Sequence, residues 1–408
     1  MQAISQLTNL TVLNISQNYH LRGGSDRMFF MTENLLRQKG HQVIPFTAAH
    51  PQNQTTNWAS YFPQAADFDN PKPLDLLRFI YSQPAANAIR QLIGDVSPHI
   101  AHLHIYYGKL TSSILEPLHN MDIPIVQTLH EYKLICPVYS LLSNGQICES
   151  CQGHHFWRAI PKKCNRQSFA RTLLSVTETY ISQFLGSVEK VNHFIAVSDF
   201  VRAKMIQYGI PAEKITTIHN FVDYAHICPT DNRGKYFLYV GRLEEYKGLF
   251  TLINAASELP HIPLFIVGDV PIYQRLNAEI ERKNVSHIKM LGFQSGDMLD
   301  KLIEECLCMI LPSECYETFG LTILEAFAHG RPVIASEIGG IPEAVVNEVD
   351  GFLIESGNSQ ALREKMDWLS RNPHRAAEMG RAGREKVEKR FGPEPYYNKL
   401  IHVYESLL

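Results

Sequence analysis

Cationic and glycine residues that could bind a phosphate group occur in the second half of the chain. The stretch 241–248 reads Gly-Arg-Leu-Glu-Glu-Tyr-Lys-Gly and follows an apolar run at Phe237–Val240. A helix start beside Arg242 and Lys247 favours phosphate, because the free backbone amides, the helix dipole and the two side chains are all positive. The alternative interpretation is a solvated turn that happens to carry two charges.

Two glutamates further along, Glu317 and Glu325, are suited to accepting hydrogen bonds from the hydroxyl groups of a sugar. We expect Glu317 in the loop after a strand at Met309–Leu311, and Glu325 about two turns into the next helix. Gly320 allows backbone to approach a ligand closely, and the amides of residues 319–321 could hold a phosphate. Alternatively, Glu317 is a loop charge and Glu325 is stabilised by the helix dipole.

Four of the eight cysteines are close together in the sequence, at Cys136, Cys148, Cys151 and Cys164. In a chain without a secretory signal this spacing favours a metal over disulfides. Four thiolates suit a tetrahedral structural zinc ion, which would stabilise a small lobe with little core of its own. His154 or His155 could replace one cysteine, and free thiols or an iron–sulfur or redox site are the alternatives.

Short apolar runs alternate with amphipathic stretches in both halves, which is typical of βα units around parallel sheets. In the first half the expected strands are Val12–Ile15, Val43–Phe46, Ile100–Leu103, Ile125–Thr128 and Phe194–Val197. In the second half they are Phe237–Val240, Leu264–Val267, Ile288–Leu291, Met309–Leu311 and Val333–Ala335. A helix is predicted at Asp26–Lys39 and ends at Gly40.

The pattern predicts two Rossmann-like, doubly wound α/β domains that face a central cleft, where the carboxyl ends of their strands would bind ligands. The polar segment Asn220–Lys235 is the expected linker. The predicted domains are residues 1–222, with the cysteine-rich lobe at about 136–164, and residues 223–385. Residues 386–408 form a C-terminal helix expected to pack back on the first domain.

Composition narrows the class of protein. The chain has 408 residues, of which 45% are hydrophobic and 19% charged, as in soluble globular proteins. Its formal charge of −3 gives no reason to expect nucleic acid as a partner. Met1–Asn9 lacks the features of a secretory signal and no apolar run reaches about 18 residues, so we expect a cytoplasmic protein with at most peripheral membrane contact at the inner face.

Three motifs, in this order, resemble those of the retaining glycosyltransferases of family 4, a GT-B family, over essentially the whole chain. They are Gly241-Arg242-Leu243 with Lys247-Gly248, then Glu317 and Glu325 around Phe319-Gly320, then Gly339-Gly340-Ile341-Pro342-Glu343. Weaker matches are Gly23-Gly24-Ser25, Gly40-His41-Gln42-Val43, Val197-Ser198, Asn220 before Val222-Asp223, and Gly268-Asp269. Phe221 and Asp26 depart from the pattern, where the family usually has Gly and often has Glu.

The resemblance implies roles for these residues in binding a nucleotide-sugar donor. Arg242 and Lys247 would neutralise its diphosphate, Glu325 would bind the ribose and Glu317 would contact the transferred sugar. Further donor contacts are implied at Gly23, Gly24, Ser198, Asn220, Gly268, Gly292, Phe293, Thr318, Phe319, Gly320 and Leu321.

His130 follows the expected strand Ile125–Thr128 and matches a family histidine that faces the donor sugar. Its alternative role is merely to end that strand. In this family the departing diphosphate is stabilised by cations and amides, so no cofactor or divalent metal is expected for transfer. Glu317 would position groups and stabilise charge rather than act as an established nucleophile.

The resemblance implies transfer to a glycan, glycolipid or carrier-lipid acceptor in cell-surface polysaccharide synthesis. A GT-B protein that binds nucleotide sugar without transfer is the main alternative. An NAD-dependent oxidoreductase would need a G-x-G-x-x-G fingerprint, which does not follow the first strand. A phosphorylase would need the context of a pyridoxal-bearing lysine, which is not apparent.

Residues 150–175 carry five basic side chains and no acidic ones. The basic residues are Arg158, Lys162, Lys163, Arg166 and Arg171. Phe156, Trp157 and Phe169 lie among them. Cations mixed with aromatics are expected where a protein meets anionic headgroups or a phosphate-linked carrier lipid. The alternative is that the aromatics cover the core of the lobe and the cations are simply solvated.

Overall fold

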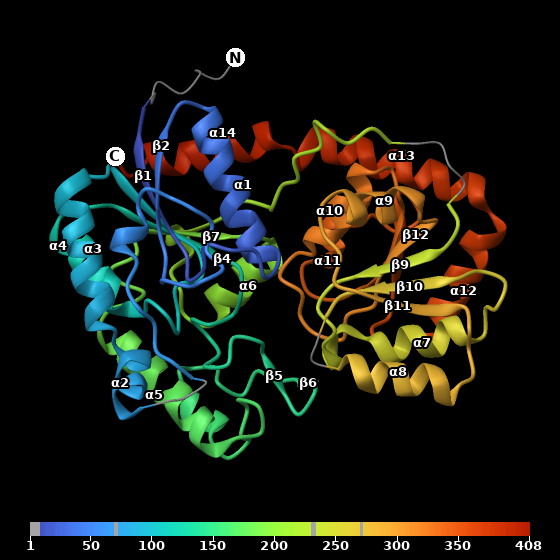
Figure 1. Cartoon of the computed structure of the whole chain (residues 1–408), viewed down its shortest axis with the longest axis horizontal. Coiled ribbons are helices and arrows are strands. Elements are labelled where there is room, and N and C mark those ends of the chain that lie inside the picture. Colours follow the sequence, from blue (N-terminus) through green and yellow to red (C-terminus); the bar gives the residue numbers. More distant parts are fainter. Residues whose placement is uncertain (1–8, 69–71, 230–233, 270–271) are drawn as a thin grey trace. The chain divides into compact units, whose positions relative to one another are not determined.

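The computed structural model describes residues 9–68, 72–229, 234–269 and 272–408 of the chain (Figure 1). It divides into two compact units. Unit 1 comprises Met1–Asn144, Cys148–His219 and Tyr396–Leu408, and unit 2 comprises Gly145–Ile147 and Asn220–Pro395. The domain boundary was predicted between residues 222 and 223, and the two units divide three residues earlier, between His219 and Asn220.

Unit 1 contains a six-stranded parallel sheet in the order β2-β1-β3-β4-β7-β8. The strands are β1 (Thr11–Ile15), β2 (Gln42–Phe46), β3 (Ile100–Leu103), β4 (Ile125–Leu129), β7 (His193–Ala196) and β8 (Ile215–Thr217). Its helices are α1 (Gly24–Gln38), α2 (Pro73–Ile80), α3 (Gln83–Val96), α4 (Leu115–Asn120), α5 (Phe169–Phe184) and α6 (Asp199–Gln207). The central strands are buried, as the coverage of both sheet faces by helices requires.

Unit 2 contains a second six-stranded parallel sheet, in the order β11-β10-β9-β12-β13-β14. The strands are β9 (Phe237–Val240), β10 (Leu264–Val267), β11 (Ile288–Gly292), β12 (Cys308–Leu311), β13 (Val333–Ser336) and β14 (Gly351–Ile354). Its helices are α7 (Leu249–Ser257), α8 (Tyr273–Arg282), α9 (Asp297–Glu305), α10 (Leu321–Ala328), α11 (Ile341–Ala344), α12 (Ser359–Arg371) and α13 (Pro373–Arg390). This strand order is that of the Rossmann fold.

The last helix, α14 (Pro393–Glu405), supplies unit 1 with the residues from Tyr396 onward. Within unit 1, the Tyr396 hydroxyl lies 3.1 Å from Thr32 Oγ1, and the Tyr404 hydroxyl lies 2.7 Å from His102 Nδ1. Both tyrosines are buried. The C-terminal segment is therefore part of the core of unit 1.

The doubly wound parallel sheets predicted from the sequence are confirmed in each unit, and all ten predicted strands are present to within one or two residues. The prediction missed β8 and β14, because β8 has three residues and β14 begins with glycine. The predicted helix 26–39 begins earlier, at Gly24. Residues 1–8 of the expected signal-free N-terminus and residues 230–233 of the expected linker lie outside the described residues.

A lobe spans residues 130–168 between β4 and α5, and all of it except Gly145–Ile147 belongs to unit 1. It contains the short hairpin of β5 (Leu142–Ser143) and β6 (Gln146–Ile147) and one 3-10 turn at Phe156–Ala159. The buried residues of its small core are Cys151, Phe156 and Ala159, joined by Val176 of α5. The rest of the lobe is turns and bends. Its first part is buried, with Tyr132, Leu134, Ile135, Val138, Leu141 and Leu142, but from residue 143 to residue 168 only the three core residues are buried.

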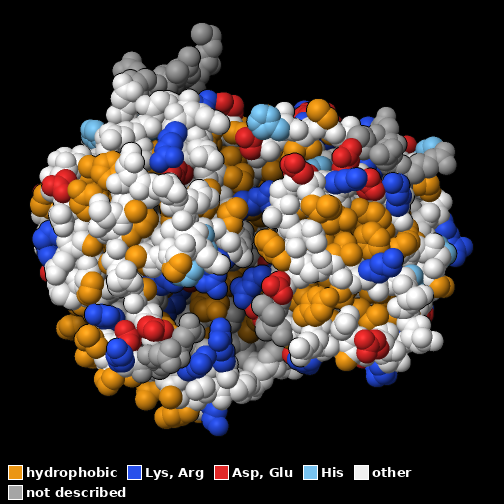
Figure 2. Space-filling view, in the orientation of Figure 1, with side chains coloured by type: hydrophobic (Ala, Val, Ile, Leu, Met, Phe, Trp, Pro, Cys, Tyr) orange, Lys and Arg blue, Asp and Glu red, His pale blue; other side chains and the backbone are white. Residues whose placement is uncertain are grey.

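Unit 1 exposes apolar side chains on two neighbouring helices, α2 and α5. Figure 2 shows hydrophobic and basic side chains gathered over this part of unit 1, at the lower left. We call the exposed residues of the two helices and the adjoining turn the apolar patch: Leu74, Leu76, Leu77, Trp157, Phe169, Leu173, Tyr180 and Phe184. In the described part of the chain, no helix has both the length and the apolar character needed to cross a membrane.

Candidate active site

The residues predicted to bind phosphate and sugar lie where the strand order of unit 2 reverses. Neighbouring strands β9 and β12 lead to the next strands on opposite sides of the sheet, and this switch point opens a crevice at their carboxyl ends. Arg242 and Lys247 follow β9, and Glu317 follows β12. The sheet topology thus brings two stretches about 70 residues apart to one edge.

Lys247 and Glu317 form an ion pair at this edge. Lys247 Nζ lies 2.6 Å from Glu317 Oε1, and their side chains are 21% and 13% exposed. The Ser313 hydroxyl also donates to Glu317 Oε1. Although burial raises the pKa of Glu317, the ammonium group and these hydrogen bonds hold it below its ordinary value. Burial lowers the pKa of Lys247, but the Glu317 carboxylate more than offsets this and raises it.

Glycines hold the loop that carries Glu317. The Gly340 amide donates to the Glu317 carbonyl at 2.8 Å. Gly339 has φ +62°, and a Cβ there would lie 2.3 Å from the same carbonyl oxygen. Gly248, after Lys247, has φ +71°, and its Cβ would lie 1.8 Å from the Pro312 carbonyl oxygen. Gly248 and Gly339, from two of the three motifs, are therefore required because the backbone comes too close to these carbonyl oxygens for a side chain to fit.

Arg242 occupies a more exposed position than Lys247. Its side chain is 59% exposed and paired with Glu244. The Tyr239 hydroxyl donates to the Arg242 carbonyl at 2.9 Å, and a Cβ on Gly268 would lie 2.0 Å from the Gly241 carbonyl oxygen. The backbone of Arg242 is therefore fixed, and its guanidinium is partly exposed, as a group that binds a ligand phosphate must be.

The start of α10 supplies backbone amides near the ion pair. Gly320 is its N-cap at φ +94°, and Phe319 before it is fully buried against Phe391 of the same unit. Thr318 and Leu321 are half-buried. Glu325 is 5% exposed and is the fifth residue of α10, just over one turn in rather than the expected two, because the helix begins only after Gly320.

The remaining predicted donor contacts of unit 2 lie at strand ends. Gly268 follows β10, and Gly292 is the last residue of β11 at φ +68°. Phe293 is 67% exposed. Asn220, the first residue of unit 2, is buried, as is Phe221 beside it, where the family usually has glycine.

In unit 1 the glycine loop lies at the corresponding reversal of strand order, between β1 and β3. Gly23 is the N-cap of α1, and a Cβ there would meet nothing within 4 Å, so open space lies beside it. The buried Asp26 carboxylate accepts from the Arg22 amide at 3.1 Å and from Asn18 at 3.3 Å. Asp26 therefore shapes this loop where a longer glutamate often stands in the family.

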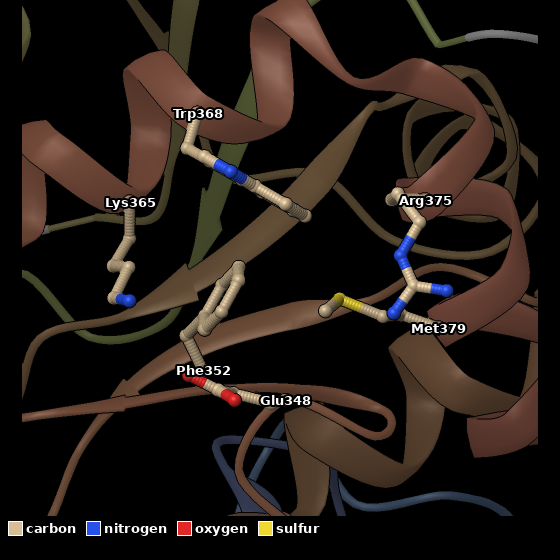
Figure 3. A pocket seen from close by; sticks show the side chains of 6 residues that line it. All are labelled: Glu348, Phe352, Lys365, Trp368, Arg375 and Met379. Atoms are coloured by element: carbon tan, nitrogen blue, oxygen red, sulfur yellow. The ribbon is translucent and has the colours of Figure 1, made fainter.

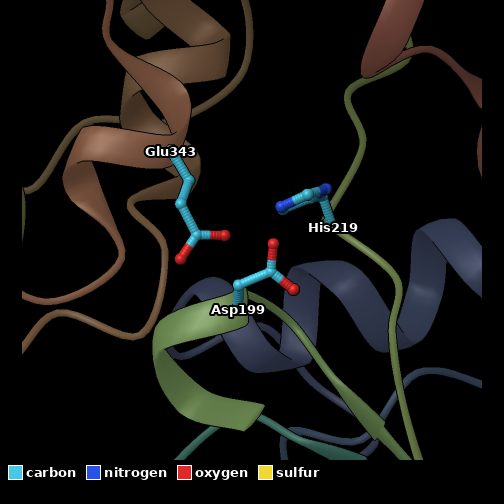
Figure 4. A group of neighbouring side chains, drawn as sticks. All are labelled: Asp199, His219 and Glu343. Atoms are coloured by element: carbon cyan, nitrogen blue, oxygen red, sulfur yellow. The ribbon is translucent and has the colours of Figure 1, made fainter. Parts of the chain in front are cut away.

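Ser198 has a structural role in this protein. Its hydroxyl accepts from the Val201 amide at 3.1 Å and caps α6, whose first residue, Asp199, is shown in Figure 4. The Thr217 hydroxyl of β8 donates to the Asp199 carboxylate at 2.5 Å. These contacts fix the start of α6 to the end of the sheet of unit 1.

His130 belongs to a stack of three histidines at the carboxyl ends of β3 and β4. His104 Nδ1 lies 2.8 Å from His130 Nε2, and their rings are nearly parallel at 5.1 Å. His102 stacks on His104 at 4.6 Å and is held by Thr128 and Tyr404, each at 2.7 Å. Burial lowers the pKa of His102 to about 3 and that of His130 to about 4, so both rings are neutral.

The tautomers of this stack follow from hydrogen-bond accounting. His104 Nε2 is buried and has no hydrogen-bond partner within the described residues. An unpaired buried N–H costs about 1–3 kcal/mol, so the proton of His104 belongs on Nδ1, which donates to His130 Nε2. His130 then carries its own proton on Nδ1, and the stack orients it as a neutral hydrogen-bond donor.

Figure 3 shows a pocket of unit 2 that is not part of this site. It is lined by Glu348, Phe352, Lys365, Trp368, Arg375 and Met379. Glu348 precedes β14, so the pocket lies at the amino end of that strand, whereas the candidate site lies at carboxyl ends. Two of the lining residues, Phe352 and Trp368, form an edge-to-face ring contact with their centroids 5.3 Å apart.

Within unit 2, the structure brings Lys247, Glu317 and the start of α10 together around the end of β12. Sequence reasoning missed Ser313 and His104, which bond directly to predicted site residues. A signal for His104 exists, since His102 and His104 are spaced i and i+2 and so face the same side of an extended segment. For Ser313 there is none, because its contact depends on how the loop folds back.

Two doubly wound units, one with a phosphate-suited site at its switch point, define a protein of the GT-B class. Sucrose-phosphate synthase from Thermosynechococcus elongatus superposes over 98% of this chain and 99% of its own with a TM-score of 0.72 at 18% identity. Anabaena HepE in complex with UDP-glucose superposes over 98% of this chain and 100% of its own, with a TM-score of 0.67 at 19% identity. The predicted GT-B fold is confirmed.

The family follows from the sequence profiles. Residues 22–226 match Glycosyltransferase Family 4 and residues 227–386 match Glycosyl transferases group 1. The chain belongs to glycosyltransferase family 4.

Curated relatives are similar to parts of the chain. An uncharacterized glycosyltransferase of Methanocaldococcus jannaschii is 32% identical over 43% of this chain and 50% of its own length. O-antigen chain mannosyltransferase C of Escherichia coli is 28% identical over 58% of this chain and 66% of its own. A D-rhamnosyltransferase of Pseudomonas aeruginosa is 27% identical over 54% and 60%, respectively. The chain thus spans half to two thirds of the length of these relatives.

Proposed function

We propose that this protein transfers a sugar from a nucleoside-diphosphate sugar to a glycan, glycolipid or carrier-lipid acceptor, with retention of the anomeric configuration. The observation that carries the proposal is the Lys247–Glu317 ion pair beside the amides of α10, at the switch point of unit 2. It combines a cation and helix N-terminus for a diphosphate with a carboxylate for a sugar. HepE, a structural neighbour, binds UDP-glucose.

Each residue has a role in this reaction. Lys247 and Arg242 neutralise the charge that develops on the departing diphosphate, and the amides at residues 319–321 bind its oxygens. The acceptor hydroxyl attacks the face that the diphosphate leaves and passes its proton to a phosphate oxygen. Glu317, fixed by Lys247 and Ser313, positions the sugar, and no divalent metal is needed.

The reaction is tested by following nucleoside-diphosphate release from the donor in the presence of a lipid extract and EDTA. We expect release that EDTA does not diminish, and a product whose anomeric configuration, read by NMR coupling constants, matches that of the donor. An inverted product would refute retention. A requirement for added Mg²⁺ or Mn²⁺ would refute metal-independent transfer.

The apolar patch of unit 1 supports an acceptor carried by a membrane. Phe169, Leu173, Tyr180 and Phe184 form one exposed stripe along α5. The opposite, buried face of α5 is mostly polar, with Thr172, Ser175, Glu178, Thr179 and Ser182. This distribution is the reverse of the usual one for a helix on a soluble domain.

The neighbouring helix α2 has the same reversed character. Its leucines at 74, 76 and 77 are exposed, whereas Asp75 is buried and accepts from the Lys72 amide at 3.0 Å. The basic residues predicted to face anionic groups are all exposed near α5: Arg158, Lys162, Lys163, Arg166 and Arg171. Phe156 is the exception among the predicted contact residues, since it is buried in the core of the lobe.

We therefore propose that unit 1 binds the surface of an anionic bilayer through the apolar patch and these cations. Each cation near such a surface contributes about 1 kcal/mol, and the exposed rings add apolar burial. The proposed location is the inner face of the cytoplasmic membrane, where lipid-linked sugars would be accessible as acceptors. Relatives include an O-antigen mannosyltransferase.

Vesicle sedimentation tests this surface. A variant with Lys163, Arg166 and Arg171 changed to Gln should bind anionic vesicles at least about tenfold more weakly than wild type. Lys162 is left in place because its Nζ lies 3.3 Å from Cys148 Sγ. The control changes Lys235, Arg282 and Lys389, exposed cations of unit 2, to Gln and alters the net charge equally. Equal binding by the two variants, or salt-insensitive binding by wild type, would refute the proposal.

A further inference from the structure

The four clustered cysteines lie in one small part of unit 1. Cys136 and Cys151 are buried, and Cys148 and Cys164 are half-buried. The Cys151 thiol is close enough to interact electrostatically with the other three thiols. Cys151 and Cys164 also share the small core of the lobe. The fold therefore gathers residues that are up to 28 positions apart in the sequence.

Backbone amides already face two of the sulfur atoms. The amides of Val138 and Leu141 point to Cys136 Sγ, and the amide of Ser150 points to Cys148 Sγ. Amides at positions i+2 and beyond stabilise a thiolate, because they place partial positive charge on the sulfur. Hydrogen bonds of this kind are common around a metal-ligating sulfur, although a thiol sulfur also accepts them.

Two sulfurs also have polar side-chain neighbours. Cys148 Sγ lies 3.3 Å from both Ser150 Oγ and Lys162 Nζ, and Cys164 Sγ lies 3.7 Å from Ser143 Oγ. No three of the four sulfurs lie within 4.8 Å of one another in the described structure. A tetrahedral site with Zn–S bonds of about 2.3 Å needs sulfurs about 3.8 Å apart. Binding of a zinc ion therefore requires the four sulfurs to come closer together than they are in this structure.

From residue 143 onward the lobe buries few side chains, and ion pairs join the lobe to helices of unit 1. Glu149, between two of the cysteines, pairs with Lys204 of α6 at 2.6 Å. The buried Lys133, three residues before Cys136, pairs with Glu178 of α5 and donates to Thr179 at 2.9 Å. Cys136 and Cys148 lie between these anchors, and Cys151 and Cys164 follow in the sparsely buried part of the lobe. A metal would therefore fix the part that apolar packing supports least.

We propose that Cys136, Cys148, Cys151 and Cys164 bind one structural zinc ion. Each thiol gives up its proton to solvent as its sulfur binds the metal, so the site forms with release of protons and without any redox change. The histidines are not needed as ligands, and His154 Nδ1 already lies 2.9 Å from Gln183 Nε2. The site adjoins the segment from His130 and steadies the lobe between β4 and α6.

Metal content of the full-length protein tests the proposal. Protein purified without a metal-binding tag should contain about one zinc per chain by elemental analysis. The double variant Cys148→Ser with Cys151→Ser should contain none. Cys228→Ser, the matched control, removes an exposed cysteine of unit 2 and should keep the metal. A strong chelator should lower the unfolding temperature of wild type and of the control, but not that of the double variant.

Thiol counting separates the alternatives, and it needs only the wild-type protein. Denatured in chelator without reductant, a zinc protein releases all eight cysteines as free thiols. Fewer thiols would indicate disulfides and overturn the proposal. Eight thiols without zinc would overturn it in favour of free cysteines, and iron with visible absorption would overturn it in favour of an iron–sulfur cluster.

Discussion

At the scale of residues, the candidate site depends on the partly buried ion pair of Lys247 and Glu317, and we propose a different role for each residue. In the proposed reaction Lys247 supplies charge for a diphosphate, and Glu317 is held by its contacts with Lys247 and Ser313. Because each partner stabilises the charge of the other, the two groups stay ionised across the neutral range. The lowered pKa of Glu317 means that its share of stability is lost only as the pH falls below its ordinary value of 4.5.

Glu317→Gln should reduce the rate of transfer by about 100-fold, because the neutral amide can neither pair with Lys247 nor stabilise developing positive charge on the sugar. The free energy of unfolding should fall by about 2 kcal/mol, less than for a fully buried pair, since both side chains retain some exposure. Steady-state kinetics and urea unfolding measure the two effects. Rates within about twofold of wild type would remove Glu317 from the site.

The histidine stack makes the stability of the protein depend on pH. Because the pKa values of His102 and His130 lie below that of an unfolded histidine, the unfolded state binds more protons between about pH 4 and 6.5. Stability should therefore fall as the pH decreases through this range, by up to about 1.4 kcal/mol per pH unit for each histidine.

The variant His102→Asn isolates this effect from that of buried carboxylates such as Asp26, whose pKa is raised by burial and which act in the opposite direction. Urea unfolding at several pH values should show a shallower fall in stability between pH 6.5 and 5 than in wild type. The same slope in both proteins would mean that His102 is not held neutral.

Residue identities could be predicted from the sequence where they belong to motifs, and their contacts could not. Arg242, Lys247 and Glu317 were identifiable from residue type and position after strands. The bond from Ser313 to Glu317 and the pairing of His104 with His130 depend on loops and on ring stacking between adjacent strands. Such contacts leave no periodic signal.

At the scale of elements, the loop after β12 is held in place by a glycine of the next loop, Gly339, which follows β13. Gly339→Ala should displace the Glu317 backbone, because its Cβ would lie 2.3 Å from a carbonyl oxygen. We expect a loss of about 2–3 kcal/mol in unfolding free energy and a loss of transfer activity comparable with that of Glu317→Gln.

Gly357→Ala is the matched control for this change. Gly357 has φ +77° and its Cβ would meet only Glu314 Cδ, at 4.0 Å, so it incurs similar backbone strain without the overlap. Its activity should stay near that of wild type. If the two variants behave alike in both stability and activity, the close approach at Gly339 does not hold the site.

The strands follow from short apolar runs that alternate with amphipathic stretches, which is why doubly wound parallel sheets were predictable. The lobe at residues 130–168 was not, beyond its cysteines. Its turns place non-glycine residues such as Tyr139, Leu141 and His154 at positive φ, which no local preference indicates. Similarly, the reversed character of α2 and α5 appears only once burial is known, because an amphipathic pattern does not say which face points inward.

At the scale of the whole molecule, the candidate functional residues are distributed between the two units. Unit 2 holds the ion pair and the helix start suited to a nucleotide sugar, and unit 1 holds the glycine loop, the histidine stack and the apolar patch. The C-terminal segment from Tyr396 belongs to unit 1 although it follows unit 2 in the chain, through contacts such as that of Tyr404 with His102. Unit 1 is therefore complete only when this last segment of the chain is in place.

The central claim is that the Lys247–Glu317 site binds a nucleoside-diphosphate sugar without metal. The most direct measurement is thermal unfolding of wild type and Lys247→Ala in EDTA with UDP-, GDP- and ADP-sugars. At about 100 times its dissociation constant, the correct donor stabilises the folded state by about 2.7 kcal/mol and should raise the unfolding temperature of wild type by about 5 °C. One donor class should do so, and Lys247→Ala should show no shift. No shift with any donor, or equal shifts in both proteins, would contradict the account.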